Sequence, residues 1–340
     1  MGPEFELIDR IRERLGRRGD RVLRTLGDDA AIVRTEGVTI TSVDAFVEGV
    51  HFRLATTSLG DLGHKCLAAA LSDLAAVGAS AGEAYFALGL PPNVGERETL
   101  ELIAGAEDLA AELGVTICGG DLTISNELFV AVTVVGHAAD ETKLVGRDGA
   151  SPGHLVGVSG RLGGAGAGLV LLERKEHGLP VQVGERLLER QRRPRPLLEA
   201  GAALARAGVS AMIDLSDGLA SDSVRLSQES SVALEIELAR LPLDDGVDAV
   251  AELVGTTGPE LAASAGEDYE LLFTAPPEAR QAIESAAEQV STAITWVGSA
   301  IGGGGVRLLD DQGAARALEG WDHLVARSAT GPPDRGQASR

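Results

Sequence analysis

Hydrophobic and polar positions in the first part of the chain alternate with the periods of helices and strands. Apolar residues recur every three or four positions in three segments, which predicts helices at residues 4–15, 59–77 and 96–113. Apolar, β-branched runs bounded by turn residues predict strands at residues 30–34, 38–43, 83–90, 115–118 and 128–138. The helix at 59–77 has apolar residues on all sides, so we expect it to be buried over most of its surface.

A second alternation of strands and helices follows a segment rich in Gly, Ser and Pro at residues 146–153. Strands are predicted at 154–159, 211–215, 232–238, 271–275 and 294–298, and helices at 165–174, 197–207, 219–228 and 277–289. This interleaving predicts an α/β (α+β) layered domain. We therefore expect domains at 1–148 and 149–327, followed by a flexible tail at 328–340 that shows no apolar periodicity.

The chain is strongly acidic, with a formal net charge of -21 from 51 acidic and 30 basic residues. Such a surface repels nucleic acid and anionic membranes, so neither is expected as a partner. No apolar run is long enough to span a bilayer, and the N-terminus lacks the basic and apolar pattern of a signal peptide. Cys66 and Cys118 are flanked by apolar residues or glycine and are expected to be reduced core thiols of a cytoplasmic protein.

Aspartates stand where apolar structure is predicted. Asp73 lies in the apolar helix, Asp214 in an apolar strand, and Asp44 directly after the strand at 38–43. Burying such a charge is costly unless the carboxylate is paired or binds a metal. Further aspartates next to glycine turns or strand ends are Asp28, Asp29, Asp121, Asp217 and Asp268. Helix capping or turns remain an alternative for several of them, since Asp favours these positions.

Magnesium is the cation that this set of carboxylates suits. Mg²⁺ prefers oxygen ligands and bridges carboxylates to substrate phosphates. The chain contains only three lysines, Lys65, Lys143 and Lys175, so several Mg²⁺ ions are the expected means of neutralising bound ATP.

Other motifs are weaker. The glycine-rich run at 160–168 follows a strand and opens a helix, as a dinucleotide fingerprint does, but the acidic residue expected at the end of a second strand is missing. We expect a flexible turn or an anion-contacting loop there. The sequence has no P-loop, no protein-kinase signature set and no recognisable Ser–His–Asp arrangement.

Six segments, in this order and spacing, resemble the thiamine-monophosphate kinase family. They are GDDAAIV (27–33), TSVDAFVEGVHF (41–52), LGHKCLAAALSDLAAVGA (62–79), GGDLTIS (119–125), IDLSDGLASD (213–222) and GEDYELLFT (266–274). The resemblance covers nearly the whole chain and extends to the wider superfamily of aminoimidazole ribonucleotide synthetase. It implies a two-domain aminoimidazole ribonucleotide synthetase-like fold whose N-terminal sheet domain forms a homodimer. It also implies Mg²⁺-dependent transfer of the ATP γ-phosphoryl group to thiamine monophosphate, giving thiamine diphosphate and ADP by direct in-line displacement.

The resemblance also implies roles for individual residues. The implied metal ligands are Asp29, Ser42, Asp44, Asp73, Asp214 and Asp217, with Asp28 as a neighbour. Gly120, Asp121, Arg147 and Ser216 would bind ATP, and His51, Glu267 and Trp321 would line the thiamine monophosphate site. Asp73, Asp214 and Arg147 would act in the transfer itself.

Two departures and several alternatives stay open. Val43 and Leu122 stand where the family often has threonine, which removes side-chain oxygens next to Asp44 and Asp121. His51 could instead be a loop histidine, Arg147 a solvated boundary residue and Trp321 a packing residue. The competing functions are a sister enzyme, such as aminoimidazole ribonucleotide synthetase, and a non-catalytic nucleotide-binding homologue.

Overall fold

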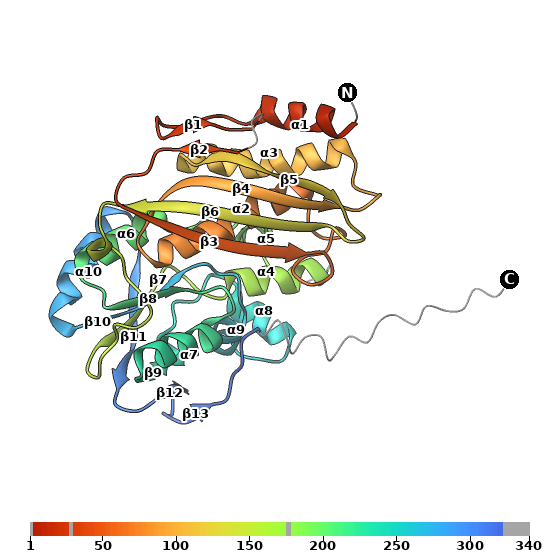
Figure 1. Cartoon of the computed structure of the whole chain (residues 1–340). Helices are drawn as coiled ribbons and strands as arrows, with labels where there is room; N and C mark the ends of the chain where they lie inside the picture. Colours follow the sequence, from red (N-terminus) through yellow and green to blue (C-terminus); the bar gives the residue numbers. More distant parts are fainter. Residues whose placement is uncertain (1–2, 27–29, 175–177, 322–340) are drawn as a thin grey trace.

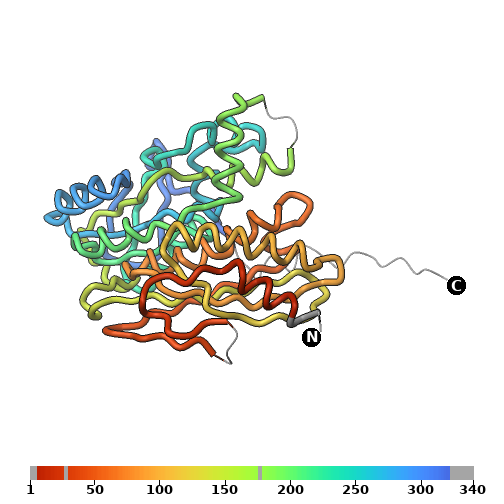
Figure 2. The backbone as a smooth tube through the Cα atoms, turned by 90° about the horizontal axis from the view of Figure 1, so that it is seen from above, coloured from red at the N-terminus to blue at the C-terminus, as the bar shows by residue number. Residues whose placement is uncertain are grey.

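A computed structural model of the chain describes residues 3–26, 30–174 and 178–321. Asp28, Asp29 and the tail predicted at 328–340 lie outside the described residues. Two sheets organise the protein, one in each half of the chain (Figure 1). The two halves lie side by side along their length, as Figure 2 shows from above.

The first half contains a four-stranded sheet in the order β3-β6-β4-β5. Its strands are β3 (Val38–Val47), β4 (Ser80–Leu90), β5 (Thr116–Ile124) and β6 (Phe129–Ala138). Only β4 and β5 pair in parallel. The long helices α2 (Leu59–Ala76) and α3 (Glu96–Leu113) share one hydrophobic core with the inner face of this sheet. Helix α1 (Pro3–Arg14) packs on α3, and β1 (Val22–Arg24) pairs with β2 (Ile32–Val33) as a separate ribbon.

The second half contains a seven-stranded sheet in the order β13-β12-β9-β11-β7-β10-β8. These strands are β7 (Leu155–Ser159), β8 (Ala211–Asp214), β9 (Ala233–Glu237), β10 (Leu271–Ala275), β11 (Ile294–Ile301), β12 (Gly305–Leu309) and β13 (Ala315–Arg316). Its helices are α4 (Gly164–Glu173), α5 (Val181–Arg192), α6 (Leu198–Ala207), α7 (Leu219–Ser230), α8 (Val247–Leu253), α9 (Gly258–Ser264) and α10 (Arg280–Gln289). Single 3₁₀ turns are η1 (Glu141–Lys143), η2 (Leu238–Arg240) and η3 (Pro277–Ala279). One core lies between the sheet and α7 and α9, and a second lies between the sheet and α6 and α10.

Helix α2 contributes to the hydrophobic cores of both halves. Its Ala75 and Ala76 join the core formed by α6, α10 and the second sheet, while the rest of its apolar surface faces the first sheet. Fifteen of its 18 residues are buried. The expectation that this helix is enclosed on most sides is therefore confirmed, and the reason is that it is packed between the two sheets.

Several predicted strand ends differ from the structure, and two of the wrong ends concern candidate site residues. Strand β3 does not stop at residue 43, because Asp44 pairs with Val132 of β6 and lies within the strand. Strand β5 continues to Ile124, so Gly120 and Asp121 lie in an edge strand rather than in a polar loop. Edge strands tolerate polar side chains because one side of the strand is left unpaired.

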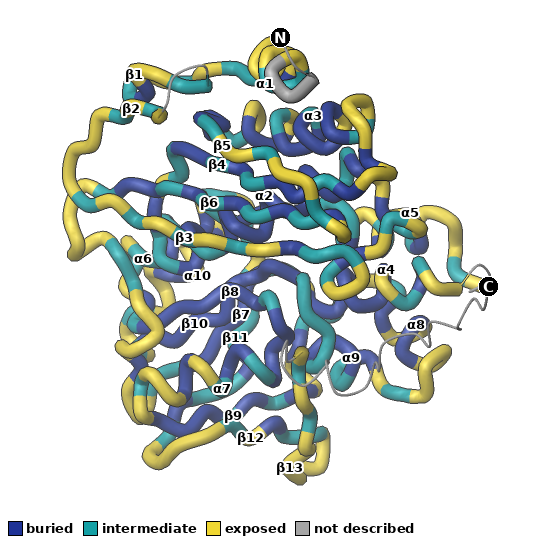
Figure 3. Tube along the Cα trace, turned by 45° about the vertical axis from the view of Figure 1, so that its right-hand side comes forward, coloured by how far each residue is buried: buried dark blue, intermediate teal, exposed yellow. Residues whose placement is uncertain are grey.

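In the part of the chain that the structure describes, no helix covers the outer face of the first sheet. Exposed and half-buried residues follow the outer strand β3, where Val43 is 62% exposed, and the end of β5 (Figure 3). The candidate ligand Ser42 alternates with Val43 and so faces the opposite, helix-covered side. Among the described residues, no helix is long and apolar enough to span a membrane.

Candidate active site

Four of the predicted aspartates meet where the two halves of the chain touch. Asp44 comes from β3, Asp73 from α2, Asp214 from the end of β8 and Asp217 from the loop before α7. We call these four residues the acid group. Two serines orient it: the Ser42 hydroxyl donates a short hydrogen bond to the Asp73 carboxylate, and Ser72 Oγ donates to Asp214 Oδ2 at 2.8 Å. Adjacent residues of α2 therefore link a strand of the first sheet to a strand of the second.

The acid group is electrostatically crowded. Burial raises the pKa of Asp44 to about 6, and the charges of Asp73 and Asp217 contribute to the rise. Burial also raises the pKa of Asp214 to about 8, again with a contribution from Asp73. Within the described residues, Asp44, Asp73 and Asp214 form no ion pair, so their charges repel one another without a protein cation between them.

The chemistry of these donors, rather than their spacing, suits a hard divalent cation. Buried carboxylates are stable when a cation compensates them, and Mg²⁺ takes carboxylate oxygens as ligands. In the described parts of the chain, no three or more His, Cys, Asp or Glu side chains are arranged closely enough to hold one ion together. The predicted ligand Asp29 lies outside those parts. The complete ligand set therefore stays a prediction.

A strained loop at residues 266–270 packs against the segment that carries Asp214 and Asp217. Glu267 and Tyr269 have positive φ values of 68° and 50°, which are uncommon for residues with side chains. The loop is held in this shape by main-chain hydrogen bonds from Glu267 N to Ser216 O (2.8 Å) and from Tyr269 N to Leu215 O (2.9 Å). The GEDYE and IDLSDG motifs therefore lie against each other, and Ser216 takes part through its carbonyl group.

Both carboxylate oxygens of Glu267 have protein partners. Lys65 Nζ lies 2.7 Å from Oε1, and Gln191 Nε2 donates to Oε2 at 2.6 Å. The side chain of Lys65 is 4% exposed and comes from α2. Sequence reasoning missed Lys65, although a lone lysine inside an apolar helix is a signal that a buried acid must lie opposite it.

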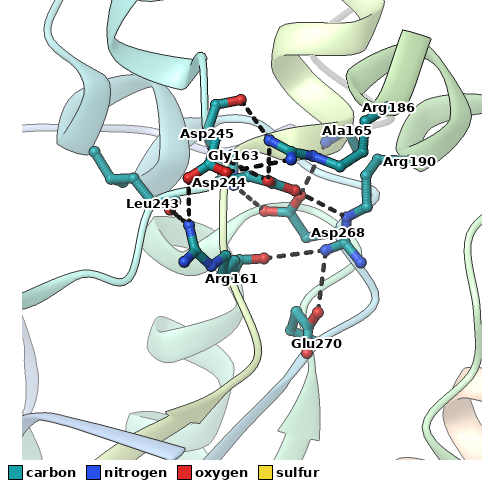
Figure 4. A network of polar contacts seen from close by, with 10 residues as sticks. All are labelled: Arg161, Gly163, Ala165, Arg186, Arg190, Leu243, Asp244, Asp245, Asp268 and Glu270. Carbon is teal, nitrogen blue, oxygen red and sulfur yellow. Dashed lines mark hydrogen bonds and ion pairs between the residues drawn. The ribbon is translucent and has the colours of Figure 1, made fainter. Parts of the chain in front are cut away.

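The glycine-rich turn at 160–168 contacts an anion, but this anion is a side chain of the protein itself. The main-chain N–H groups of Gly163 and Ala165 donate to the two oxygens of Asp268 at 2.6 and 3.1 Å, at the N-terminus of α4 (Figure 4). Helix N-termini favour negative charge in this way. Arg190 adds an ion pair to Glu270 at 3.0 Å, so the strained loop is fastened on both sides of Tyr269.

A main-chain hydrogen bond of Trp321 places this residue next to Asp217 of the acid group. Its N–H donates to the carbonyl oxygen of Asp217 at 2.9 Å, and its side chain is 44% exposed. His51 lies in the turn after β3, where its Nδ1 accepts a hydrogen bond from Val47 N at 3.0 Å and its ring meets Phe46 edge-on. The expected substrate contacts of both residues stay predictions.

Two of the candidate nucleotide residues, Gly120 and Asp121, lie apart from the acid group. Gly120 and Asp121 are exposed on β5, whereas Ser42 and Asp44 are on β3, at the opposite edge of the same four-stranded sheet. Three strand spacings separate these edges, which is roughly 14 Å. A Cβ atom on Gly120 would lie 1.8 Å from the carbonyl oxygen of Phe86, so the approach of β4 already requires a glycine at this position.

Arg147 is also exposed. Its carbonyl group accepts a 2.6 Å hydrogen bond from Ser230 Oγ, which fixes the main chain at the start of the second half. Its side chain is thus carried by an anchored segment, and its contact with ATP stays a prediction.

The matches to known families agree with this architecture. Residues 27–138 match the family described as AIR synthase related protein, N-terminal domain, and residues 151–311 match AIR synthase related protein, C-terminal domain. The chain is thus an AIR synthase related protein with both domains of that class.

Individual relatives narrow the assignment. The thiamine-monophosphate kinase of Methanopyrus kandleri is 33% identical over 307 residues, which cover 90% of this chain and 92% of that protein. The crystal structure of thiamine-monophosphate kinase from Stenotrophomonas maltophilia K279a is 34% identical with a TM-score of 0.80, and the match covers 92% of this chain and 98% of that one. A structure of AaThiL complexed with AMPPCP and TMP is 28% identical with a TM-score of 0.74, covering 94% and 97% of the two chains. The chain belongs to the thiamine-monophosphate kinase family.

Proposed function

We propose that this protein transfers the γ-phosphoryl group of ATP to thiamine monophosphate, giving thiamine diphosphate and ADP. The observation that carries the proposal is the acid group: β3, α2, β8 and the loop before α7 bring four aspartates together, and no cation of the described residues pairs with Asp44, Asp73 or Asp214. A protein has little reason to maintain such repulsion unless it binds cations there. The solved complex of AaThiL with AMPPCP and TMP supports this choice of ligands.

Magnesium ions held by Asp29, Ser42, Asp44, Asp73, Asp214 and Asp217 would offset the charge that develops on the transferred phosphoryl group. The protein's own part is to place oxygens. The hydroxyl groups of Ser42 and Ser72 orient Asp73 and Asp214 before any ligand arrives. Arg147, Asp121, Gly120 and Ser216 would contact ATP, and His51, Glu267 and Trp321 would contact thiamine monophosphate.

The transfer requires no strong base. The phosphate of thiamine monophosphate is already an anionic oxygen nucleophile near neutral pH, so the barrier is mainly one of repulsion and alignment. We therefore infer direct in-line transfer without a phosphorylated protein intermediate. Protein that retains label from γ-labelled ATP after denaturation would contradict this step.

The decisive assay is turnover. Purified protein is incubated with ATP, Mg²⁺ and thiamine monophosphate, and thiamine diphosphate is detected by chromatography, with a reaction lacking Mg²⁺ as the control. Asp73→Asn is expected to lower kcat at least about 100-fold because it removes a carboxylate from the acid group. Asp108→Asn, an exposed aspartate of α3, is the matched control and should keep full activity. ATP binding without any thiamine diphosphate would point to a sister enzyme of the superfamily.

We also propose a homodimer formed through the first sheet. No helix of the described residues covers the outer face of this sheet, and the exposed Val43 lies on it. A partner would also explain how Asp121, on the edge opposite Asp44, can meet the same nucleotide. The reduced thiols of Cys66 and Cys118, which are buried and unpaired as disulfides, suit a cytoplasmic protein.

Mixed dimers test whether Asp121 acts on the partner's acid group. The variants Asp121→Asn and Asp73→Asn are each expected to be inactive on their own. They are purified separately and then unfolded and refolded together. If Asp121 acts across the dimer, the mixed dimers recover one complete site and part of the activity. If no activity returns although mixed dimers form, Asp121 does not complete the partner's site.

A further inference from the structure

Arg225 lies on a carboxylate of the acid group. It belongs to α7, the helix that starts directly after Asp217 and Gly218. One terminal nitrogen of its guanidinium is 2.5 Å from Asp217 Oδ2, and the other is 3.7 Å from Asp222 Oδ1. The Arg225 side chain is 44% exposed, whereas both carboxylates are buried. A half-exposed cation therefore covers an oxygen that is a predicted metal ligand.

The main chain of Asp217 is fixed on both sides. Its N–H donates to Asp222 Oδ2 at 3.0 Å, and its carbonyl oxygen accepts a hydrogen bond from Trp321 N at 2.9 Å. Asp222 itself is fully buried, and among the described residues its Oδ1 accepts no hydrogen bond. The backbone that carries Asp217 is thus held in place, and the long, half-exposed side chain of Arg225 is the part of this contact that is able to move.

Asp217 also faces the rest of the acid group. Its charge contributes, after burial and Asp73, to the raised pKa of Asp44. A cation that binds Asp217 together with those carboxylates would stand close to the guanidinium. Two positive ions cannot occupy neighbouring positions on one carboxylate without repulsion, so the cation and Arg225 compete for Asp217.

We propose that Arg225 is a further nucleotide-binding residue, which neutralises Asp217 while no cation is bound and turns to a phosphate oxygen of the nucleotide once a cation takes its place. This inference rests on the proposed function. Arginine suits the contact with the nucleotide because its planar guanidinium binds phosphate oxygens through two parallel hydrogen bonds. The chain has a net charge of -21, so it offers few positive side chains to attract phosphates. A guanidinium released from Asp217 would stay next to the acid group and attract the phosphates of the nucleotide.

The proposal predicts effects of opposite sign on two ligands, measured without turnover. Arg225→Met keeps the length of the side chain and removes its charge. Binding of Mn²⁺ in the absence of nucleotide, followed by electron paramagnetic resonance, should become about tenfold tighter, because the competing charge is gone. Binding of a non-hydrolysable ATP analogue at saturating Mg²⁺, followed by calorimetry, should become about tenfold weaker, because a charged hydrogen bond is lost.

Two further variants make the result specific. Arg225→Lys keeps the charge and should bind Mn²⁺ as the wild type does, while its nucleotide affinity falls only in part. Arg240→Met removes a comparably exposed arginine that pairs with Glu237 and should change neither affinity. Unchanged or weaker Mn²⁺ binding by Arg225→Met, or unchanged nucleotide binding, would overturn the proposal. Wild-type protein that binds neither Mn²⁺ nor the analogue would instead overturn the proposed function, and this inference with it.

Discussion

Replacing Lys65 by methionine tests how the strained loop behind the acid group is held. The ammonium group lies 2.7 Å from Glu267 Oε1, with the two side chains 4% and 26% exposed. Methionine fills a similar volume but leaves Glu267 with the hydrogen bond from Gln191 alone. Removing one partner of a buried pair costs about 3–5 kcal/mol. Because a quarter of Glu267 is in water and Gln191 remains, we expect the free energy of unfolding to fall by about 2–3 kcal/mol.

A double-mutant cycle isolates this pair from the loss of packing. Urea unfolding is measured for Lys65→Met, Glu267→Gln and the double variant, and we expect a coupling energy of about 2 kcal/mol. Lys143→Met is the control, since this lysine is exposed and its replacement should cost little. Because Glu267 is a predicted substrate residue, KM for thiamine monophosphate should rise more than kcat falls. Additive effects in the cycle, with a coupling energy near zero, would refute the reasoning.

Two other variants test the acid group and the helix pair. The pKa of Asp214 is raised to about 8, so the folded protein binds this proton more tightly than the unfolded chain does, and stability without metal must fall as the pH rises from about 4 to about 8. Asp214→Asn should remove this loss of stability, so the variant should be more stable than wild type at pH 8 by on the order of 3 kcal/mol, with a smaller difference at pH 5. The variant should nevertheless be inactive. A wild-type melting temperature that does not change between pH 4 and pH 8 would contradict the argument. Gly63→Ala places a Cβ atom 1.9 Å from the carbonyl oxygen of Leu102, so α2 and α3 must separate. The melting temperature should fall by an amount equivalent to about 1–3 kcal/mol. An unchanged melting temperature would show that the two helices move apart without a loss of stability.

The elements that the sequence predicts best are those with clear ends. Helix α3 has the predicted bounds because Gly114 takes a left-handed conformation with φ of 72° and ends it. Helix α5 was not predicted, since its polar surface is broad and only Gly184, Leu187 and Gln191 are buried. The predicted end of β3 at residue 43 is wrong because the polar residue Asp44 continues the strand. A single chain gives no signal that distinguishes an aspartate inside an edge strand from one that terminates it.

The candidate site was predictable where burial and charge conflict. Asp73 and Asp214 stand in apolar segments, so their need for compensation is visible in the sequence, and the structure places both in the acid group. Arg225 gives no such signal, because an arginine on an amphipathic helix is ordinary. Its importance follows only from the 2.5 Å contact with Asp217, which depends on how α7 starts.

Helix α2 connects the predicted metal residues to the predicted substrate residue. Its polar side chains reach the second half of the chain along one stripe: Asp61 to Arg193, His64 to Pro194, Lys65 to Glu267 and Ser72 to Asp214. Its apolar surface packs on the first sheet, which carries Asp44. Any shift of one half that separated Lys65 from Glu267 would therefore also change the distance between Asp73 and Asp214. The two parts of the site must move together, because a single buried helix positions both.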